Sequence, residues 1–209
     1  MAIPKAYLEP LGVMPVVVID RVEDAVPLAN ALKAGGIKAI EVTLRTDAAV
    51  EALRMIKAEC SGIEVGVGTV VSINQLHTVA ELGVDFAVSP GYTPSLVDAA
   101  NELNVQLLPG VSTLSEVMMG MEQGLSCFKL FPAAAVGGLA LLKSFAGPLP
   151  QISFCPTGGL TFESFSDYLA LPNVACVGGT WLAPKALVDA GDWAAITEIA
   201  RATVAKISN

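Results

Sequence analysis

The chain has 209 residues, of which 53% are hydrophobic and 15% charged, and this length fits one larger domain or two small ones. Its net charge of −8 argues against nucleic acid or an anionic membrane surface as a partner. The positive mean hydropathy of +0.61 does not predict a membrane-spanning helix, because Pro148, Pro150, Pro156 and the Gly158–Gly159 pair interrupt the uncharged residues 144–162.

Predicted strands recur along the whole chain as short apolar runs that are bounded by Gly and Pro. These runs are residues 15–19, 39–45, 64–70, 86–90, 106–111, 127–132, 152–159 and 174–181. Segments with apolar residues at three- and four-residue spacing lie between them and predict helices, for example over residues 23–34 and 47–60. Residues that can cap a helix precede several of these segments: Asp47, Ser72, Thr93, Thr113 and Thr161.

This order of elements predicts the fold. Eight strands that alternate with eight helices favour a closed (β/α)8 barrel with a parallel sheet. A doubly wound open sheet is the alternative, but no GxGxxG motif follows the first predicted strand. Since the sequence contains neither a linker nor a shift in composition, we expect a single domain over residues 1–209. The N-terminal residues lack a secretory signal pattern, so we expect a cytoplasmic protein.

The four cysteines and the single histidine do not form a metal-binding pattern. Cys60, Cys127, Cys155 and Cys176 contain no CxxC pair, and three of them lie in apolar strand-like runs, where reduced thiols pack as small hydrophobic groups. His77 falls in the helix predicted over residues 72–82, and one histidine cannot build a histidine-based zinc site. We therefore expect neither a metal site nor a cofactor.

The second predicted strand carries polar residues toward the barrel interior. In AIEVTLRT, residues 39–46, alternation places Glu41, Thr43 and Arg45 on one face and Val42 and Leu44 on the other. The apolar pair packs under the helices, so the polar face points to the barrel axis. Active sites of such barrels lie at the carboxyl ends of the strands. The alternative is a buried Glu41–Arg45 pair that only closes the barrel.

A lysine interrupts the sixth predicted strand, in SCFKLFPAAA at residues 126–135. Lys129 is the only one of eight lysines that is embedded in a strand near its carboxyl end. Desolvation by Phe128, Phe131 and Pro132, and a nearby Arg45 cation, would favour the neutral amine. A neutral amine is a nucleophile toward carbonyl groups. The alternative is a lysine that reaches the rim of the barrel with its charged end.

Two glycine pairs follow the last two predicted strands, in PTGGLT at residues 156–161 and in VGGTWLAP at residues 177–184. Glycines in such turns let backbone N–H groups approach a phosphate closely, with help from the positive end of a short helix. The loops after strands seven and eight are where barrel enzymes commonly hold phosphate. The two pairs therefore predict a phosphate site.

The motifs EVTLRT, GVGTV, AVSPG, LLPGVST, FKLFPAA, FCPTGG and VGGTWL occur in this order. Together they closely resemble the bacterial 2-keto-3-deoxy-6-phosphogluconate (KDPG) aldolases, class I Schiff-base aldolases that also act on 4-hydroxy-2-oxoglutarate (KHG). The resemblance implies cleavage of KDPG to pyruvate and glyceraldehyde 3-phosphate, and of KHG to pyruvate and glyoxylate. It also implies a homotrimer that needs neither metal nor cofactor.

The resemblance also implies roles for individual residues. Lys129 corresponds to the lysine that forms the imine, and Glu41 to the acid/base. Arg45 and Thr69 correspond to residues that contact the pyruvate end of the substrate. Further substrate contacts are implied at Pro90 and Phe131 and, for the phosphate, at Thr157, Gly158, Gly159, Gly179 and Thr180. Some members of the family have Ser where Thr180 stands, and the hydroxyl is common to both.

Two other functions compete with an aldolase. A non-catalytic barrel that senses a phosphorylated metabolite would keep the glycine pairs and would have no need of Lys129 or Glu41. A sugar-phosphate epimerase usually needs metal-binding histidines, which this chain does not supply. The aldolase accounts for the lysine and the glycine pairs together.

Overall fold

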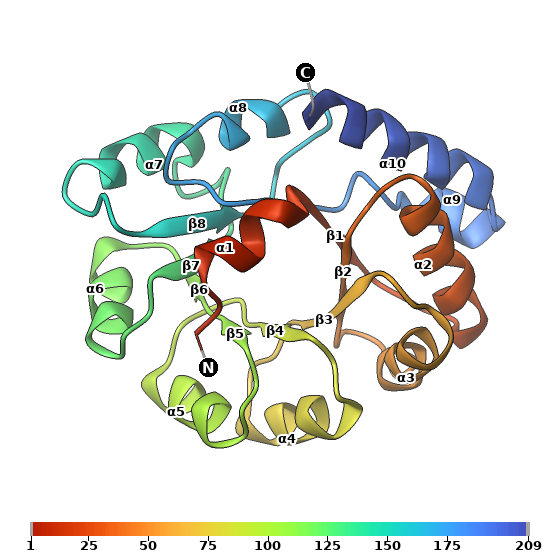
Figure 1. The fold of residues 1–209 in the computed structure, drawn as a ribbon, viewed down its shortest axis with the longest axis horizontal. Coiled ribbons are helices and arrows are strands. Elements are labelled where there is room, and N and C mark those ends of the chain that lie inside the picture. The colour runs from red at the N-terminus through yellow and green to blue at the C-terminus, as the bar shows by residue number, and fades with distance from the viewer. Residues whose placement is uncertain (1, 208–209) are drawn as a thin grey trace.

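The computed structural model describes residues 2–207, in which β-strands alternate with α-helices (Figure 1). The strands are β1 (Val13–Val17), β2 (Ala39–Thr43), β3 (Glu64–Gly68), β4 (Phe86–Val88), β5 (Leu107–Leu108), β6 (Gly110–Val111), β7 (Cys127–Leu130), β8 (Ser153–Pro156) and β9 (Val177–Gly179). The helices are α1 (Lys5–Leu8), α2 (Ala25–Ala34), α3 (Ala49–Glu59), α4 (Ile73–Leu82), α5 (Pro94–Glu102), α6 (Leu114–Glu122), α7 (Gly138–Ala146), α8 (Phe165–Leu169), α9 (Lys185–Ala190) and α10 (Trp193–Ile207). Two short 3-10 helices, η1 (Glu9–Leu11) and η2 (Val22–Asp24), precede β1 and α2.

The strands form a parallel α/β fold. They pair in two hydrogen-bonded ladders, one in the order β5-β4-β3-β2-β1-β9 and one in the order β6-β7-β8. Figure 1 shows α2 to α10 around the outside of the strands, with α1 across the middle of the view. None of the helices formed by residues 2–207 is both long enough and apolar enough to cross a membrane.

The ladders differ from the single closed sheet that the sequence predicts. The fifth predicted strand is split at Pro109, because proline has no N–H to donate to a ladder. β5 pairs with β4 and β6 pairs with β7, while the Pro109 carbonyl accepts the Lys129 N–H at 2.9 Å. Between β8 and β9 the contacts are isolated parallel bridges, Phe154 to Val174 and Thr157 to Gly178.

Three of the five predicted helix caps are confirmed. The side chains of Ser72, Thr93 and Thr113 accept hydrogen bonds from backbone N–H groups in the first turns of α4, α5 and α6. The other two predictions are wrong. α3 begins after Ala48 rather than Asp47, and α8 begins after Ser164 rather than Thr161, whose N–H donates to the Ser164 hydroxyl at 3.1 Å.

The space between the strands is divided into an apolar and a polar part. At the amino ends of the strands, a cluster of buried residues joins strand side chains to the N-terminal segment: Ile3, Leu8, Met14, Ala39, Phe86, Val88, Leu108, Cys127, Cys155, Ala175 and Cys176. Further along the same strands the buried residues become polar, with Glu41 and Thr43 on β2 and Lys129 on β7. A separate and larger apolar core packs the outer face of the strands against the helices.

Candidate functional site

The interior position of Lys129 follows from the alternation of β7. Phe128 and Leu130 belong to the apolar core under the helices, so Cys127 and Lys129 face the interior. Only 5% of Lys129 is exposed. The alternative that its ammonium reaches the rim of the barrel is therefore wrong.

Lys129 is held by an acidic partner in this interior. Its Nζ lies 3.1 Å from Oε1 and 3.5 Å from Oε2 of Glu41, which is 1% exposed. Taking two such charges out of water costs several kcal/mol per ion, and a buried ion pair often adds nothing to stability over an apolar pair. The pair therefore calls for a chemical explanation.

Arg45 is not the partner of Glu41, so the alternative of a buried Glu41–Arg45 pair is wrong. Arg45 is exposed at the carboxyl end of β2, and its Nε donates to Oγ1 of Thr69 at 3.2 Å. β2 ends at Thr43, and the Arg45 N–H donates to the Thr43 carbonyl two residues earlier. The alternation of side chains holds only within the strand. The Arg45 guanidinium therefore lies at the mouth of the pocket, while the Glu41 carboxylate is buried inside.

A pocket of about 170 Å³ opens above Lys129. It is lined by Val16, Arg45, Lys129, Phe131, Thr157, Gly158, Gly159, Leu160, Gly179 and Thr180. Eight of these ten residues are predicted site residues. Glu41 joins the group through Lys129, and Thr69 joins it through Arg45. Nζ of Lys129 lies 5.4 Å from the centroid of the Phe131 ring.

Pro90 does not line this pocket, although the family resemblance implies a substrate contact there. It is half-buried at the end of β4, and its carbonyl group packs closely against Gly110. The sequence analysis missed Val16 and Leu160. Alternation along β1 from the buried Met14 could have identified Val16, and Leu160 directly follows the glycine pair. Val16 therefore carries a signal that strand periodicity can detect.

Thr69 has a strained backbone. Its φ is +61°, in the left-handed region that β-branched residues rarely adopt. Such conformations cost of order 1–3 kcal/mol and cluster at functional sites. The turn holds the Thr69 hydroxyl against Nε of Arg45 at the mouth of the pocket.

The first glycine pair forms an unusual turn after β8. Gly158 and Gly159 have φ values of +96° and +82°, which other residues seldom adopt. Successive N–H groups in such turns form concave sites for anions. Across the pocket, Gly179 ends β9 and Thr180 is exposed beside it. The two loops thus face the same cavity.

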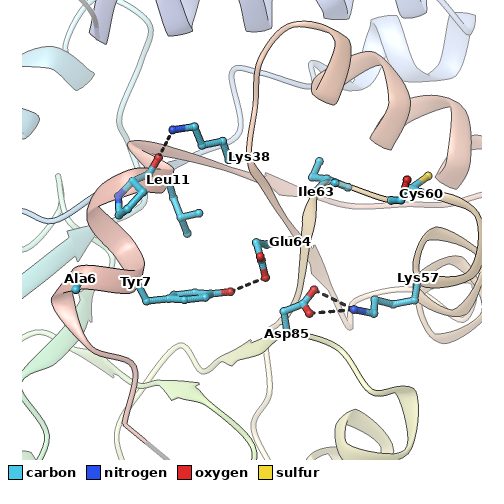
Figure 2. Close-up of a pocket in the computed structure, with 12 residues that line it drawn as sticks. Ala6, Tyr7, Leu11, Lys38, Lys57, Cys60, Ile63, Glu64 and Asp85 are labelled. Atoms are coloured by element: carbon cyan, nitrogen blue, oxygen red, sulfur yellow. Dashed lines mark hydrogen bonds and ion pairs between the residues drawn. The ribbon is translucent and has the colours of Figure 1, made fainter.

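A larger pocket of about 660 Å³ lies at the opposite, amino ends of the strands (Figure 2). Its polar side chains bind one another: the Tyr7 hydroxyl donates to Glu64 at 3.0 Å, and Lys57 contacts both oxygens of Asp85 at 3.0 Å. Lys38 donates to the Pro10 carbonyl at 2.8 Å. These bonds fasten α1, η1 and α3 to the strands, so we regard the smaller pocket as the candidate active site.

The candidate site offers an amine, a carboxylate, a guanidinium and hydroxyl groups. Among residues 2–207, no group of three His, Cys, Asp or Glu side chains is placed to hold a metal ion. The four cysteines are buried and free, and burial raises the pKa of Cys127. Lys129 and Glu41 are the buried amine and carboxylate of this site.

The fold and the site define a class of protein, the parallel α/β enzymes whose pocket lies at the carboxyl ends of the strands. Residues 5–199 match the aldolase family described as KDPG and KHG aldolase, and the chain belongs to that family. The chain is 50% identical over 192 residues to the KHG/KDPG aldolase of Escherichia coli strain K12, covering 92% of this chain and 90% of that protein. The family predicted from the motifs is thus confirmed.

Solved structures agree with this assignment. The KDPG aldolase of Legionella pneumophila, with pyruvate captured at low pH as a covalent carbinolamine intermediate, matches with a TM-score of 0.93 and 44% identity over 96% of this chain and 98% of that one. The KDPG aldolase of Zymomonas mobilis ZM4, with 3-phosphoglycerate, matches with a TM-score of 0.89 and 45% identity over 95% of this chain and 94% of that one.

The Tyr7–Glu64 bond of the larger pocket gives a pH-dependent prediction. Burial raises the pKa of Tyr7 above its ordinary value of about 10, and the hydrogen bond and charge of Glu64 raise it further. The folded protein thus keeps a proton that the unfolded chain loses, so this stabilisation is complete below pH 10 and is lost as the pH rises above it. We expect Tyr7→Phe to lower the free energy of unfolding by about 1 kcal/mol at pH 8, and urea titrations should show the difference narrowing above pH 10. A difference that is constant with pH would contradict this role.

The strained turn at Thr69 predicts that a glycine variant is more stable than an alanine variant, which is the reverse of the usual order. Thr69→Gly should be more stable than Thr69→Ala by about 0.5–1 kcal/mol, because only glycine adopts a positive φ freely, which outweighs its greater entropy when unfolded. Both variants lack the hydroxyl, so urea titration compares the backbone alone. Thr78 in α4 is a matched control, where the Ala variant should be the more stable of the pair. If the Ala variant were more stable than the Gly variant at Thr69 as well as at Thr78, backbone strain at Thr69 would be excluded.

Proposed function

We propose that the protein is a class I aldolase that cleaves KDPG to pyruvate and glyceraldehyde 3-phosphate, and KHG to pyruvate and glyoxylate. The observation that carries this proposal is the buried Lys129–Glu41 pair, with 3.1 Å between Nζ and Oε1, at the base of the pocket. A barrel that only sensed a metabolite would have no use for two desolvated charges there.

The reaction begins with a proton transfer. Glu41 accepts a proton from the Lys129 ammonium, and the free amine attacks the keto carbon to form a carbinolamine. Glu41 returns its proton to the carbinolamine hydroxyl, which leaves as water and gives an iminium ion. The covalent pyruvate intermediate in the Legionella relative is the carbinolamine that this sequence of steps requires. The sequence predicts a free amine from desolvation and a nearby Arg45 cation, whereas here the Glu41 carboxylate removes the proton.

The iminium ion then accepts the electrons of the C3–C4 bond. Glu41 takes the proton from the C4 hydroxyl as the bond breaks, directly or through one water, and the aldehyde leaves first. The remaining enamine is protonated at C3, and hydrolysis releases pyruvate and returns the amine of Lys129. Glu41 therefore acts in more than one proton transfer.

Arg45 and Thr69 hold the carboxylate of the keto acid. The guanidinium fork of Arg45 suits a carboxylate, and its bond to the Thr69 hydroxyl keeps it at the mouth of the pocket. Phe131 covers the amine and keeps water away from it. Pro90, for which the family resemblance implies a substrate contact, follows β4 and does not line the cavity.

The phosphate lies between the two glycine loops. Thr157, Gly158 and Gly159 approach it from one side, and Gly179 and Thr180 from the other. The turn at the first pair, with two positive φ values, suits an anion. The Zymomonas relative was solved with the phosphorylated ligand 3-phosphoglycerate.

The proposal extends to the architecture. The two ladders form one closed (β/α)8 barrel in a single domain over residues 1–209, supported by the continuity of β5 and β6 across Pro109 and by the bridges from β8 to β9. The family resemblance supports a homotrimer. The four free cysteines fit a reducing compartment, and we place the protein in the cytoplasm.

Trapping with borohydride tests the imine. Incubation with pyruvate followed by borohydride should add one carboxyethyl group, the reduced imine of pyruvate, to the peptide that contains Lys129, as measured by mass spectrometry. Lys129→Met should abolish both the label and aldol cleavage. The exposed Lys143 offers a control, since Lys143→Met should label like the wild type. An unlabelled wild-type protein, or a label on another lysine, would reject the proposed function.

A comparison of two substrates tests the phosphate site. Thr180→Val should raise KM for KDPG about 3- to 10-fold, because one hydroxyl donor to a charged acceptor is lost. KM for KHG, which has no phosphate, should change little. Thr180 is preferable to Gly159, where a methyl group would lie 2.5 Å from Cβ of Ala134 on a backbone with φ of +82°. Thr161→Val is the matched control in the neighbouring loop, and equal losses for both substrates would remove the phosphate assignment.

A further inference from the structure

A glycine of β3 lies directly against the carboxylate of Glu41. β2 and β3 pair in parallel, with Glu41 opposite Gly66 and Thr43 opposite Gly68. The Glu41 side chain extends toward the carboxyl ends of the strands and lies beside Gly68. A methyl group on Gly68 would overlap Oε1 of Glu41 and would lie 2.8 Å from its Cγ and Cδ.

Space, and not backbone conformation, explains the glycine at this position. Gly68 is the last residue of the regular strand β3, and it is not among the described glycines with positive φ. Alanine could therefore adopt the same backbone without strain. The oxygen that a methyl group would displace is the one that lies 3.1 Å from Nζ of Lys129.

The carboxylate is the part that would move. A strand is held on both sides by its ladder, and Gly68 is paired through β2, whereas the end of a glutamate side chain can turn about three bonds. Only 1% of Glu41 is exposed, so a displaced carboxylate would find no water to replace the contact with Lys129. The missing Cβ of Gly68 therefore determines where the carboxylate can stand.

We propose that Gly68 is a positioning residue for catalysis, which leaves room for the Glu41 carboxylate to reach Lys129 and the C4 hydroxyl of the substrate. This inference rests on the proposed aldolase reaction. It assigns Gly68 no contact with the substrate, since Gly68 does not line the pocket. Its effect passes entirely through the position of Glu41.

Gly66 provides a matched control in the same strand and on the same face. A methyl group on Gly66 would overlap the ring of Phe86 and lie 2.6 Å from its Cδ2. Phe86 belongs to the apolar cluster that contacts the N-terminal segment, and no Glu41 atom is among the three atoms nearest to the added methyl group. Gly66→Ala should thus disturb packing, and Gly68→Ala should disturb chemistry.

The first experiment compares Gly68→Ala with Gly66→Ala by KDPG cleavage, pyruvate trapping and thermal unfolding. For Gly68→Ala we expect kcat to fall about 100-fold, as when an acid/base is misplaced, with KM changed less than threefold and an altered pH profile of kcat. For Gly66→Ala we expect a lower unfolding temperature with an unchanged kcat and pH profile for the folded enzyme. An unchanged kcat in Gly68→Ala, or equal losses of kcat in both variants, would overturn the inference.

The second experiment is a double-mutant cycle with Glu41→Asp. Aspartate is one methylene shorter, so Glu41→Asp alone draws the carboxylate away from Lys129. In combination with Gly68→Ala, aspartate has no atom at the position of Oε1, so the largest overlap is removed and the contact of 2.8 Å between the methyl group and Cγ stays. We expect the double variant to be at least tenfold more active than the product of the two single effects, and a purely multiplicative result would overturn the inference.

The variants remain informative if folding is affected. If Gly68→Ala does not fold and the double variant does, the overlap with Glu41 is confirmed; if neither folds, Gly68 serves packing and the inference is wrong. A wild-type enzyme that traps no pyruvate would reject the proposed function itself. If the wild-type enzyme traps pyruvate and Gly68→Ala has an undiminished kcat, only the role of Gly68 is rejected.

Discussion

The buried ion pair between Lys129 and Glu41 is the constraint on which the rest of the structure depends. The two residues are 88 positions apart in sequence, on β7 and β2, which do not pair with each other. Their side chains must therefore meet across the interior, and every element around them must leave that path open while excluding water. The cost of desolvating both charges is acceptable to an enzyme that needs a proton acceptor beside its amine.

The same strands serve stability at one end and chemistry at the other. Met14, Phe86 and Cys127 pack with the N-terminal segment at the amino ends, and two residues further along β7 the side chain is Lys129. The two glycines of β3 repeat this division, since Gly66 makes room for a buried ring and Gly68 for a carboxylate. A rigid apolar base of this kind holds the polar layer in place without taking part in the reaction.

Pocket size by itself does not identify the active site of this protein. The pocket at the amino ends is the larger, but Tyr7, Lys57, Glu64 and Asp85 satisfy one another there and fasten the helices to the strands. The smaller pocket contains a buried charge pair, a strained threonine and two glycine loops. The charge pair and the strained backbone cost stability, and such costs are typical of functional sites. The ion pairs of the larger pocket satisfy one another near the surface and do not indicate a function.

The sequence by itself determined the order of strands and helices, the family, and the interior position of Glu41 and Lys129, because strand alternation and apolar context are local properties. The tertiary structure alone decided that Glu41 pairs with Lys129 and not with Arg45, because Glu41 and Lys129 lie on strands that do not pair and meet only across the folded interior. It also placed the start of α8 after Ser164 rather than after Thr161. The roles of Thr69 and Gly68 were also visible only in the tertiary structure. The fold brings Arg45 to the strained Thr69, and it brings the Glu41 carboxylate to the space left by the missing Cβ of Gly68.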